Sequence, residues 1–459
     1  MILNPKIFRA YDIRGEAFVD FDEAGFYLTA QAFGQYISKK FDKKSPKIFV
    51  SGDGRISMEE LSLAVLGGLR TSGAEVVWGG AIPTPINYFA FHEGDFDASI
   101  QISASHNPPQ DNGLKFTDRK GSVCGDEIQE ILKITEHIGE NISVDLTKGT
   151  HEYLKVDYGP IYREKLKSIT APQTPLKIVA DAGNAIPGTF YPLYIKDSGH
   201  EVVELFCALD GNFPNHQPDP ERPENLKFCI EEVLKTKADL GVSFDGDGDR
   251  VGIILADGTS LNADKILYIL TADFLSRNPG EKIILDAMIS ATLIEKIRDL
   301  GGKPIVTPTG HSYIEQAMHA HNARMGGEQS GHFMFGENFY GHDDACLAVL
   351  RFITAIENNP SLIEEVTEKW PKLLEFSEKI TVEDERKFKI LDKVAAVLAE
   401  KYEHANTIDG VRIDWDDGEW AIVRCSNTSP KISVRIEAIN EESLNTKKFE
   451  ILEVLNKFL

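Results

Sequence analysis

The side chains best suited to chemistry begin with Ser105 and His106, in the stretch Ser-Ala-Ser-His-Asn-Pro-Pro at 103–109. The preceding residues, 96–102, alternate apolar and small or polar side chains, which predicts a strand. Asn107 precedes a proline and is disfavoured in the helical region, so the strand must end in an ordered turn. Open α/β sheets bind ligands at strand ends, although an ordinary polar turn would have the same pattern. The Gly-x-Ser-x-Gly elbow of serine hydrolases is absent around this serine, which therefore needs a partner from elsewhere in the chain.

Three aspartates separated by single glycines supply that partner, in Asp-Gly-Asp-Gly-Asp-Arg at 245–250. The segment follows the apolar run 240–244, so it also begins at the end of a predicted strand. Because glycine permits tight turns, the three carboxylates can converge on one hard cation. An EF-hand loop also begins Asp-x-Asp-x-Asp, but its sixth position would be Arg250 instead of glycine and its twelfth Ala256 instead of glutamate. A divalent cation beside a serine and an arginine favours phosphoryl transfer.

These two stretches and three others together resemble the pattern of a known family. The others are Phe-Arg-Ala-Tyr-Asp-Ile-Arg-Gly at 8–15, Gly-Glu-Gln-Ser-Gly-His at 327–332 and Arg-Cys-Ser-Asn-Thr at 424–428. With these motifs in this order, the chain resembles the α-D-phosphohexomutases, and most closely the bacterial phosphomannomutase/phosphoglucomutases. Each motif is moderately specific alone, but together they are highly specific and span nearly the whole chain.

The resemblance implies that phosphate moves between C1 and C6 of a hexose through a bisphosphate intermediate. Mg²⁺ would be the cofactor, and glucose or mannose 1,6-bisphosphate the activator. Ser105 would carry the phosphate, which adds a charge of about −1.5 to −2 and three acceptor oxygens. The metal ligands would then be Asp245, Asp247, Asp249 and the phosphorylated Ser105, since Mg²⁺ prefers near-octahedral oxygen coordination.

The same resemblance implies the residues for acid–base and charge-stabilising work, which are Ser105, His106, Arg14, Lys115, Arg250 and His332. As a general base, Lys115 would need a lowered pKa, which burial or the nearby Arg14 and Arg250 can supply. The sequence leaves open whether Lys115 or His332 is the base. A solvated lysine and a structural histidine are the plain alternatives at these two positions.

The substrate-binding residues implied by the resemblance are Tyr11, His311, Glu328, Ser330, Arg424, Ser426, Asn427 and Thr428. Glu328 and Ser330 match a sugar-binding loop, where a carboxylate and a hydroxyl suit vicinal diols. The turn at 424–428 would hold the phosphate that does not react, because hydroxyls, backbone N–H groups and an arginine form an anion nest. A polar turn without a ligand is the alternative in both loops, and Tyr11 and His311 fit a core role nearly as well.

Two departures from the family pattern concern potential phosphate-facing cations. Where related bacterial members often carry Asp-x-Lys, this chain has Met288, and where they often carry Lys-Thr-Gly-His, it has Pro308. The preferred hexose phosphate therefore stays open, although the phosphoserine–metal chemistry does not depend on either position. The alternatives are a phosphoglucosamine mutase, whose members usually have Ser-Gly-Thr at 426–428, a phosphatase, or a sugar-phosphate-binding protein of the same fold without activity.

Three similar stretches, at 45–105, 175–250 and 280–332, must position these loops. In each, an apolar run ending in aspartate precedes a helix-like segment, a glycine and a second apolar run, and each ends in one of the distinctive loops. This alternation predicts crossover connections and a parallel or mixed sheet in every stretch. The three loops differ in sequence but occupy equivalent positions in the three stretches, which favours one shared cleft. The alternative is that the stretches are generic α/β units that are similar by coincidence.

The predicted fold class is therefore α/β, with three similar α/β domains with mixed sheets and a smaller C-terminal α+β domain around one central cleft. We expect a phosphoserine domain at 1–155, a metal-binding domain at 156–254, a sugar-binding domain at 255–368 and a phosphate-binding domain at 369–459. In the last, a helix pattern at 386–402 is followed by short alternating stretches typical of strands.

Composition limits the classes of function. A chain of 459 residues is too long for one ordinary core, and its net charge of −23 argues against nucleic-acid binding, which would need a basic face, and against an anionic membrane surface. No apolar run approaches a membrane span, and the N-terminal residues are too polar for a signal peptide. Five scattered cysteines without Cys-x-x-Cys indicate reduced thiols. We therefore expect a cytoplasmic monomer or weak dimer whose partner is a small-molecule sugar phosphate.

Overall fold

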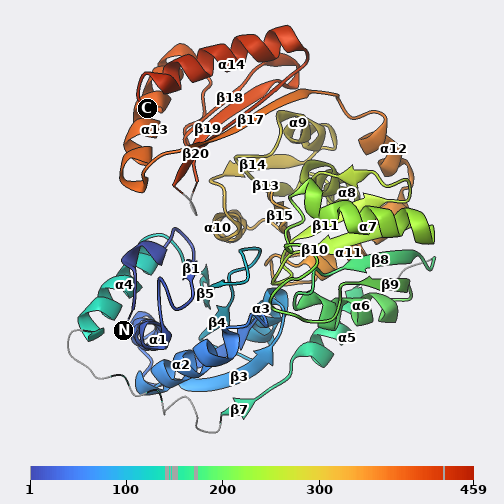
Figure 1. The fold of residues 1–459 in the computed structure, drawn as a ribbon. Coiled ribbons are helices and arrows are strands. Elements are labelled where there is room, and N and C mark those ends of the chain that lie inside the picture. The colour runs from blue at the N-terminus through green and yellow to red at the C-terminus, as the bar shows by residue number, and fades with distance from the viewer. Residues whose placement is uncertain (1, 140–143, 145, 147–152, 170–173, 427–429) are drawn as a thin grey trace. The chain divides into compact units, whose positions relative to one another are not determined.

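The computed structural model describes residues 2–139, 144, 146, 153–169, 174–426 and 430–459. The chain forms two compact units, Met1–Asn262 with Ser330–Glu357, and Ala263–Gln329 with Asn358–Leu459. Figure 1 shows their elements coloured along the chain. The sheets alternate with helices up to residue 367, and an antiparallel sheet with two helices follows, which confirms the predicted α/β class and the distinct C-terminal domain.

The first unit begins with a mixed sheet of order β1-β5-β4-β2-β3-β7, in which β6 pairs with β5. Its strands are β1 (Ile13–Glu16), β2 (Lys47–Gly52), β3 (Glu75–Ala81), β4 (Ala98–Ile102), β5 (Asp111–Asp118), β6 (Gly121–Ser122) and β7 (Leu154–Lys155). Strand β2 is parallel to β3 and β4, whereas β5 is antiparallel to β1 and β4. The accompanying helices are η1 (Pro5–Ile7), α1 (Glu23–Lys40), α2 (Met58–Thr71), α3 (Thr84–Glu93) and α4 (Asp126–Gly139).

Strand β5 illustrates how this core positions a functional side chain. Leu114 and Phe116 are buried in the core cluster with α1, and the ring of Phe116 stacks on that of Phe33 with centroids 4.3 Å apart. Successive side chains of a strand point to opposite faces, so Lys115 must leave that core on the other side. Packing of the apolar residues thus fixes the direction of a buried lysine.

The second sheet of the first unit has the order β12-β11-β10-β8-β9. Its strands are β8 (Lys177–Asp181), β9 (Glu201–Leu205), β10 (Leu240–Phe244), β11 (Val251–Leu255) and β12 (Ser260–Leu261), and the helices of this part are α5 (Gly159–Ile169), α6 (Pro187–Asp197) and α7 (Pro223–Thr236). Strand β8 is parallel to β9 and β10, while β10 and β11 form an antiparallel pair. The turn of that pair carries the aspartates. Strand β16 (Phe333–Phe335) and helix α11 (Ala345–Asn358) follow in the later segment.

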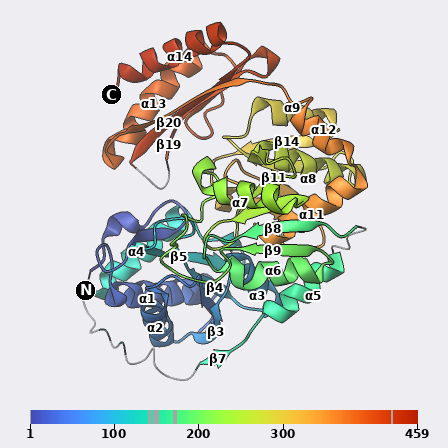
Figure 2. The same ribbon diagram turned by 45° about the vertical axis from the view of Figure 1, so that its right-hand side comes forward.

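The second unit has an α/β part and an antiparallel part. In the former, β13 (Lys282–Asp286) is parallel to β14 (Lys303–Thr307) and β15 (Met325–Gly327), with helices α8 (Ala263–Arg277), α9 (Ala291–Asp299), α10 (His311–His321) and α12 (Ser361–Thr367). The latter is a sheet of order β17-β20-β19-β18, made of β17 (Leu374–Thr381), β18 (Val411–Asp414), β19 (Trp420–Cys425) and β20 (Lys431–Ala438). Helices α13 (Asp384–Lys401) and α14 (Glu441–Asn456) lie together on one face of this sheet (Figure 2).

Successive side chains of β19 point to opposite faces of the sheet and contact both parts of the second unit. Ala421 and Val423 pack in the core under α13 and α14, whereas Trp420 and Ile422 pack against Ala287 on the opposite face. Buried arginines strengthen this contact, since Arg412 Nη1 donates to the carbonyl oxygen of Ala287 at 2.8 Å. The C-terminal sheet is therefore packed onto the loop after β13.

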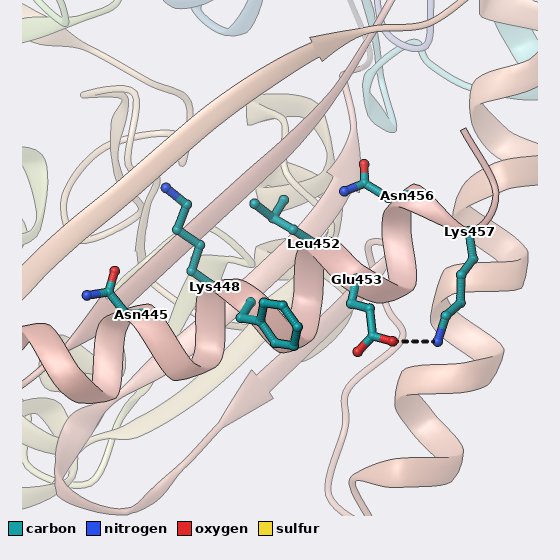
Figure 3. A pocket seen from close by; sticks show the side chains of 7 residues that line it. Asn445, Lys448, Leu452, Glu453, Asn456 and Lys457 are labelled. Atoms are coloured by element: carbon teal, nitrogen blue, oxygen red, sulfur yellow. Dashed lines mark ion pairs between the residues drawn. The ribbon is translucent and has the colours of Figure 1, made fainter.

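Among the described residues, none of the helices combines the length and the hydropathy needed to cross a membrane. A shallow pocket lies on the outer side of α14 (Figure 3). It is lined by Asn445, Lys448, Phe449, Leu452, Glu453, Asn456 and Lys457. None of these residues was predicted from the sequence to bind or to catalyse.

Candidate active site

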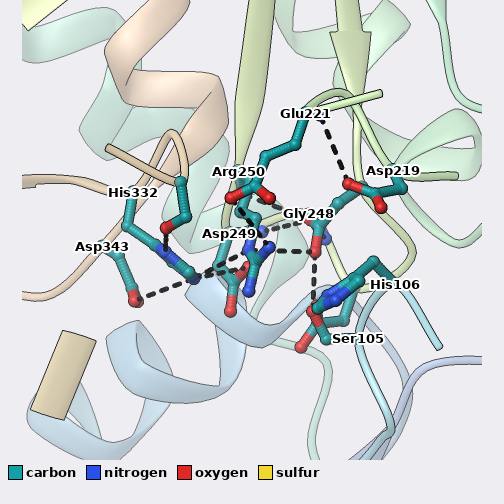
Figure 4. Close-up of polar contacts among 12 residues, drawn as sticks. Ser105, His106, Asp219, Glu221, Gly248, Asp249, Arg250, His332 and Asp343 are labelled. Carbon is teal, nitrogen blue, oxygen red and sulfur yellow. Dashed lines mark hydrogen bonds and ion pairs between the residues drawn. The ribbon is translucent and has the colours of Figure 1, made fainter. Parts of the chain in front are cut away.

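Ser105 lies in the turn after β4, with its backbone in the left-handed region at φ 51°. Its Oγ donates a hydrogen bond of 2.7 Å to Asp245 Oδ2 and lies 3.3 Å from Nδ1 of His106. Figure 4 shows the serine and this histidine beside the turn that carries Asp249 and Arg250. The structure therefore brings together the two stretches that the sequence analysis placed at strand ends.

The aspartate turn depends on its two glycines. Asp245 Oδ1 accepts the backbone N–H groups of Gly248, Asp249 and Arg250 at distances between 2.9 and 3.2 Å. Gly248 has φ 80°, a conformation that other residues rarely adopt. A Cβ on Gly246 would lie 2.2 Å from the carbonyl oxygen of Ser105. Glycine at both places lets the two loops touch.

Lys115 lies between two carboxylates, with Nζ 2.6 Å from Asp247 Oδ2 and 2.5 Å from Asp249 Oδ2. Burial lowers the pKa of Lys115, but the two aspartates raise it by more, so the pKa ends above its ordinary value. The lowered pKa that a general base at this position would need is therefore absent from this arrangement, because the carboxylates outweigh burial. Lys115 is a fixed positive charge here, and its ammonium is suited to stabilising negative charge.

Arg14 reaches the same region from β1. Its Nε lies 2.6 Å from Asp12 Oδ2, and its Nη1 donates to the carbonyl oxygen of Ala104 at 3.4 Å. Tyr11 lies three residues earlier in the chain and is half-buried. Burial lowers the pKa of Arg14, but the charge of Asp12 contributes to raising it, so the pKa ends above its ordinary value. The first strand thus places a cation against the serine loop.

Arg250 lies on the other side of the serine. Its Nε is 3.9 Å from Asp245 Oδ2, and its Nη1 is 3.7 Å from Oε1 of Glu221. Burial, Arg250 and Arg14 lower the pKa of His106 well below its ordinary value. His106 is therefore a neutral imidazole beside the serine hydroxyl near pH 7.

His332 meets Arg250 in the centre of Figure 4. Arg250 Nε donates to His332 Nε2 at 3.2 Å, and His332 Nδ1 lies 2.8 Å from Ser330 Oγ. Because Nε2 accepts, the ring hydrogen is assigned to Nδ1, which donates to the serine. Nε2 also lies 3.3 Å from Asp249 Oδ1 and 3.9 Å from Asp343 Oδ2. The imidazole is held in one orientation by Arg250, Ser330 and the neighbouring carboxylates.

The donor set of the aspartate turn fits a divalent cation. One oxygen each from Asp245, Asp247 and Asp249 lies within 4.8 Å of the others, and all three residues are fully buried. Asp247 Oδ1 has no hydrogen-bond partner among the residues that the structure describes. Burial and repulsion from Asp249 and Asp247 raise the pKa of Asp245 well above its ordinary value. A cation relieves that repulsion, and carboxylate oxygens are the ligands that Mg²⁺ prefers.

The second unit contains the predicted sugar-binding and cleft residues Glu328 and His311, and both are buried. Asp286 accepts the backbone N–H groups of Gln329 at 3.1 Å and Met288 at 3.2 Å. Burial and the charge of Glu328 raise the pKa of Asp286 to about 7. Met288, one of the two positions singled out in the sequence, thus lies in a turn that Asp286 holds through the backbone.

Arg424 and Ser426 lie at the end of β19 in the same unit. Arg424 Nε donates to Asp409 Oδ2 at 2.8 Å, and its Nη2 is buried without a hydrogen-bond partner in the part of the chain that the structure describes. The carbonyl oxygen of Ser426 accepts from the buried Lys387 Nζ at 2.7 Å. An arginine with a spare donor and a buried lysine suit an anion. The predicted Asn427 and Thr428 lie outside the described residues.

Several contributors were not singled out from the sequence. Thr84 Oγ1 donates to Asp247 Oδ2 at 2.5 Å, and Gln217 Nε2 donates to the carbonyl oxygen of His106 at 2.5 Å. Arg55 contacts the serine loop through four carbonyl groups. The sequence pattern could have pointed to Arg55, because Asp-Gly-Arg at 53–55 follows an apolar run just as the serine stretch does.

The Gln217 loop is held by a partly buried histidine. His216 Nε2 lies 3.1 Å from both carboxylate oxygens of Asp181. Burial lowers the pKa of His216, but the hydrogen bond and charge of Asp181 raise it by more, so the pKa is raised. The contact between His216 and Asp181 therefore stabilises the folded protein fully below the unfolded pKa of histidine, near 6.5. This stabilisation is lost as the pH rises through the higher pKa of His216 in the folded protein.

We expect His216→Gln to lower the melting temperature by at least about 2 °C at pH 6, and by less at pH 9. Thermal unfolding of both proteins at the two pH values checks this. His200→Gln is the matched control, because burial lowers the pKa of His200 and its contribution must not fade as the pH rises. An equal loss for His216→Gln at pH 6 and pH 9 would contradict the assignment.

Comparison with known proteins completes this description. Models of the phosphoglucomutase/phosphomannomutase family match four consecutive segments: alpha/beta/alpha domain I at 5–142, domain II at 160–258, domain III at 262–373 and the C-terminal domain at 378–454. A phosphomannomutase/phosphoglucomutase from Pseudomonas aeruginosa is 37% identical over 447 residues, which cover 97% of this chain and 94% of the relative. A phosphoglucomutase from Neisseria gonorrhoeae is 36% identical over 449 residues, covering 96% and 95%.

Among solved structures, a phosphoglucomutase/phosphomannomutase family protein from Burkholderia thailandensis has a TM-score of 0.89 at 32% identity. The match covers 99% of this chain and 98% of that one. The similarity therefore extends over all four segments.

Proposed function

Because the chain belongs to the phosphoglucomutase/phosphomannomutase family, we propose that it is a Mg²⁺-dependent phosphohexomutase that interconverts the 1- and 6-phosphates of glucose and mannose. One observation carries the proposal. The Oγ of Ser105 lies 2.7 Å from Asp245 Oδ2, at the edge of three buried carboxylates whose oxygens can share one cation. A phosphate on this serine would add a further oxygen ligand to that group.

Ser105 is the residue that carries the transferred phosphoryl group. A sugar hydroxyl oxygen bonds to phosphorus while the bond between phosphorus and Oγ breaks. Mg²⁺ held by the three aspartates would neutralise charge on the serine phosphate. Lys115, which is buried, and Arg14, which is partly buried, are positively charged and stabilise the charge of the group in transfer.

Two histidines are assigned to the attacking hydroxyl and to the leaving oxygen, respectively. We assign the proton of the attacking hydroxyl to His332, because its Nε2 is an acceptor in the contact with Arg250 and Ser330 fixes the ring through Nδ1. His106 lies 3.3 Å from Ser105 Oγ and is neutral, so it can give a hydrogen bond to Oγ as the phosphate departs. Arg250 lies near Asp245 and donates to His332, so one side chain contacts both a proposed metal ligand and the proposed base.

Recognition of the sugar phosphate uses the remaining residues. Glu328 and Ser330 bind ring hydroxyls, with Tyr11 and His311 beside the sugar. Arg424 and Ser426 bind the phosphate that does not react, supported by the Arg424 Nη2 donor, which has no hydrogen-bond partner among the described residues. Asn427 and Thr428 are assigned to the same phosphate from the motif alone. The bisphosphate intermediate, glucose or mannose 1,6-bisphosphate, would also act as the activator.

The test is conversion of hexose 1-phosphate to 6-phosphate by the purified protein, followed by NMR of the phosphorus signals. Assays with glucose, mannose and glucosamine 1-phosphates, each with and without the matching bisphosphate, identify the substrate class. Loss of conversion after EDTA treatment and its return with Mg²⁺ identify the metal. Release of inorganic phosphate without any 6-phosphate would indicate a phosphatase, and binding without either product would indicate a sugar-phosphate-binding protein.

We expect glucose and mannose 1-phosphates to have kcat/KM values within about two orders of magnitude of each other. They differ only at the C2 hydroxyl. If Glu328 and Ser330 hold O3 and O4, none of the assigned residues contacts O2. A site that hydrogen-bonds a hydroxyl rejects the wrong analogue by about 10⁴–10⁵, whereas a hydroxyl left in water is weakly discriminated. A preference near 10⁴ for one epimer would show that another residue contacts O2.

A further inference from the structure

The loop that carries Ser105 is held by one buried side chain. Arg55 is 3% exposed and donates to four carbonyl oxygens of the loop. Its Nη2 donates to Ser105 at 2.6 Å and to Asn107 at 2.8 Å, and its Nη1 donates to Pro108 at 2.6 Å and to Asp111 at 2.9 Å. A planar guanidinium with several donors can make this set of bonds, and a lysine cannot.

Asp53 orients this guanidinium and extends the support to the other end of the serine peptide. Its Oδ2 accepts Arg55 Nε at 3.1 Å and Ser103 Oγ at 2.8 Å. Ser103 Oγ in turn accepts the backbone N–H of Ser105 at 2.8 Å. Both the N–H and the carbonyl group of Ser105 are therefore fixed by one connected set of buried side chains.

The conformation held in this way is a strained one. Ser105 has φ 51°, and a serine keeps a left-handed backbone only where its surroundings determine it. With this backbone, the Oγ points to Asp245 Oδ2 at 2.7 Å. A different φ would turn the side chain away from the aspartates.

We propose that Arg55, together with Asp53, is a positioning residue that aims Ser105 and so controls whether its phosphate passes to the sugar or to water. The inference rests on the proposed function. In the productive step, the phosphorus–Oγ bond breaks, a bond to the sugar oxygen forms, and the hydroxyl proton ends on Oγ. In hydrolysis, water replaces the sugar hydroxyl, inorganic phosphate leaves, and the water proton ends on Oγ. Transfer to a bound sugar needs precise alignment, and misplacement by about 1 Å can cost about 10²-fold, whereas mobile water can approach from many directions.

The test compares Arg55→Met and Arg55→Lys with the wild type. We expect kcat to fall by about 10²-fold in Arg55→Met, while KM for hexose 1-phosphate changes by less than about threefold. The ratio of inorganic phosphate released to 6-phosphate formed is expected to rise by at least about tenfold. Arg55→Lys keeps the charge but not the four bonds, so it must show the same pattern.

Lys40→Met is the matched control, because Lys40 is a partly buried cation paired at 2.5 Å with Asp118 of β5. It is expected to lower the melting temperature without changing the product ratio. If the Arg55 variants do not fold, Ser103→Ala removes the link to the Ser105 N–H and must raise the ratio in the same direction. Folded variants with wild-type kcat and an unchanged ratio would overturn the proposal.

Hydrogen exchange separates this inference from the proposed function. The amides of residues 104–112 are expected to exchange faster in Arg55→Met than in the wild type and in Lys40→Met, whatever the substrate is. The wild type could transfer no phosphate while exchange is still faster in Arg55→Met. That result would refute the proposed function and the control of phosphate transfer by Arg55, but it would preserve the inference that Arg55 holds the Ser105 loop. Unchanged exchange in an active enzyme would overturn the positioning inference alone.

Discussion

Ser105→Ala is expected to lower conversion of hexose 1-phosphate to 6-phosphate by at least about 10⁴-fold, because it removes the atom that carries the phosphoryl group. Ser105 as a residue is 1% exposed, and its hydroxyl lies 2.7 Å from Asp245 Oδ2. The alanine therefore neither opens a large cavity nor removes a core contact. The variant must therefore fold and bind sugar phosphate normally. A coupled assay measures the rate, and calorimetry with hexose 1-phosphate measures the binding.

Thr84→Val is the control for this experiment, since Thr84 presents another buried hydroxyl to the aspartates, at 2.5 Å from Asp247 Oδ2. We expect it to cost only about tenfold, because that hydroxyl holds a carboxylate and does not carry phosphate. Peptide mapping of the purified wild type is expected to locate phosphate on Ser105. Phosphate on Thr84 alone, in a protein that stays active as Ser105→Ala, would show that the nucleophile was assigned to the wrong hydroxyl.

The parts of the site that could be predicted from the sequence are those set by short stretches of chain. Alternating apolar residues predicted the strands before Ser105 and Asp245, and the glycines between the aspartates predicted a tight turn. Both features depend on neighbours a few residues away. The parallel arrangement of β2 with β4, and of β8 with β10, then brings strand ends to common edges.

What could not be predicted depends on contacts between distant segments and on the balance of charges. Arg55 meets the serine loop about fifty residues further along the chain, and no local pattern specifies which carbonyl groups its donors reach. The sequence left open whether the pKa of Lys115 is low enough for a general base, and the direction of its shift is decided by Asp247 and Asp249 at hydrogen-bonding distance. Ser330 was assigned to the sugar, while its hydroxyl is also the partner of His332. Each of these roles is a property of the folded neighbourhood.

Asp247→Ala is expected to lower turnover by about 10²–10⁴-fold. A metal ion that neutralises developing charge supplies several kcal/mol to such a transition state, and each 1.36 kcal/mol is about tenfold in rate. Asp247 lies in the carboxylate group, and its Oδ1 is buried without a hydrogen-bond partner among the described residues, which suits a metal ligand. Activity is measured against Mg²⁺ concentration after treatment with EDTA. Near-normal turnover in the variant, with EDTA harmless to the wild type, would mean that no catalytic metal is bound there.

Stability in the presence and absence of metal gives this prediction a readout that does not depend on substrate. Asp247 raises the pKa of Asp245 by repulsion, so its removal relieves the cluster, and the variant is expected to melt near the wild-type temperature in EDTA. Mg²⁺ binds the folded wild type and must raise its melting temperature in proportion to ln(1 + [Mg²⁺]/Kd). Asp97→Asn, which alters a buried aspartate paired with Lys43 at 2.6 Å outside the cluster, must keep that response. Asp247→Ala must lose it, because two carboxylates and the ammonium of Lys115 leave little net charge for a divalent cation.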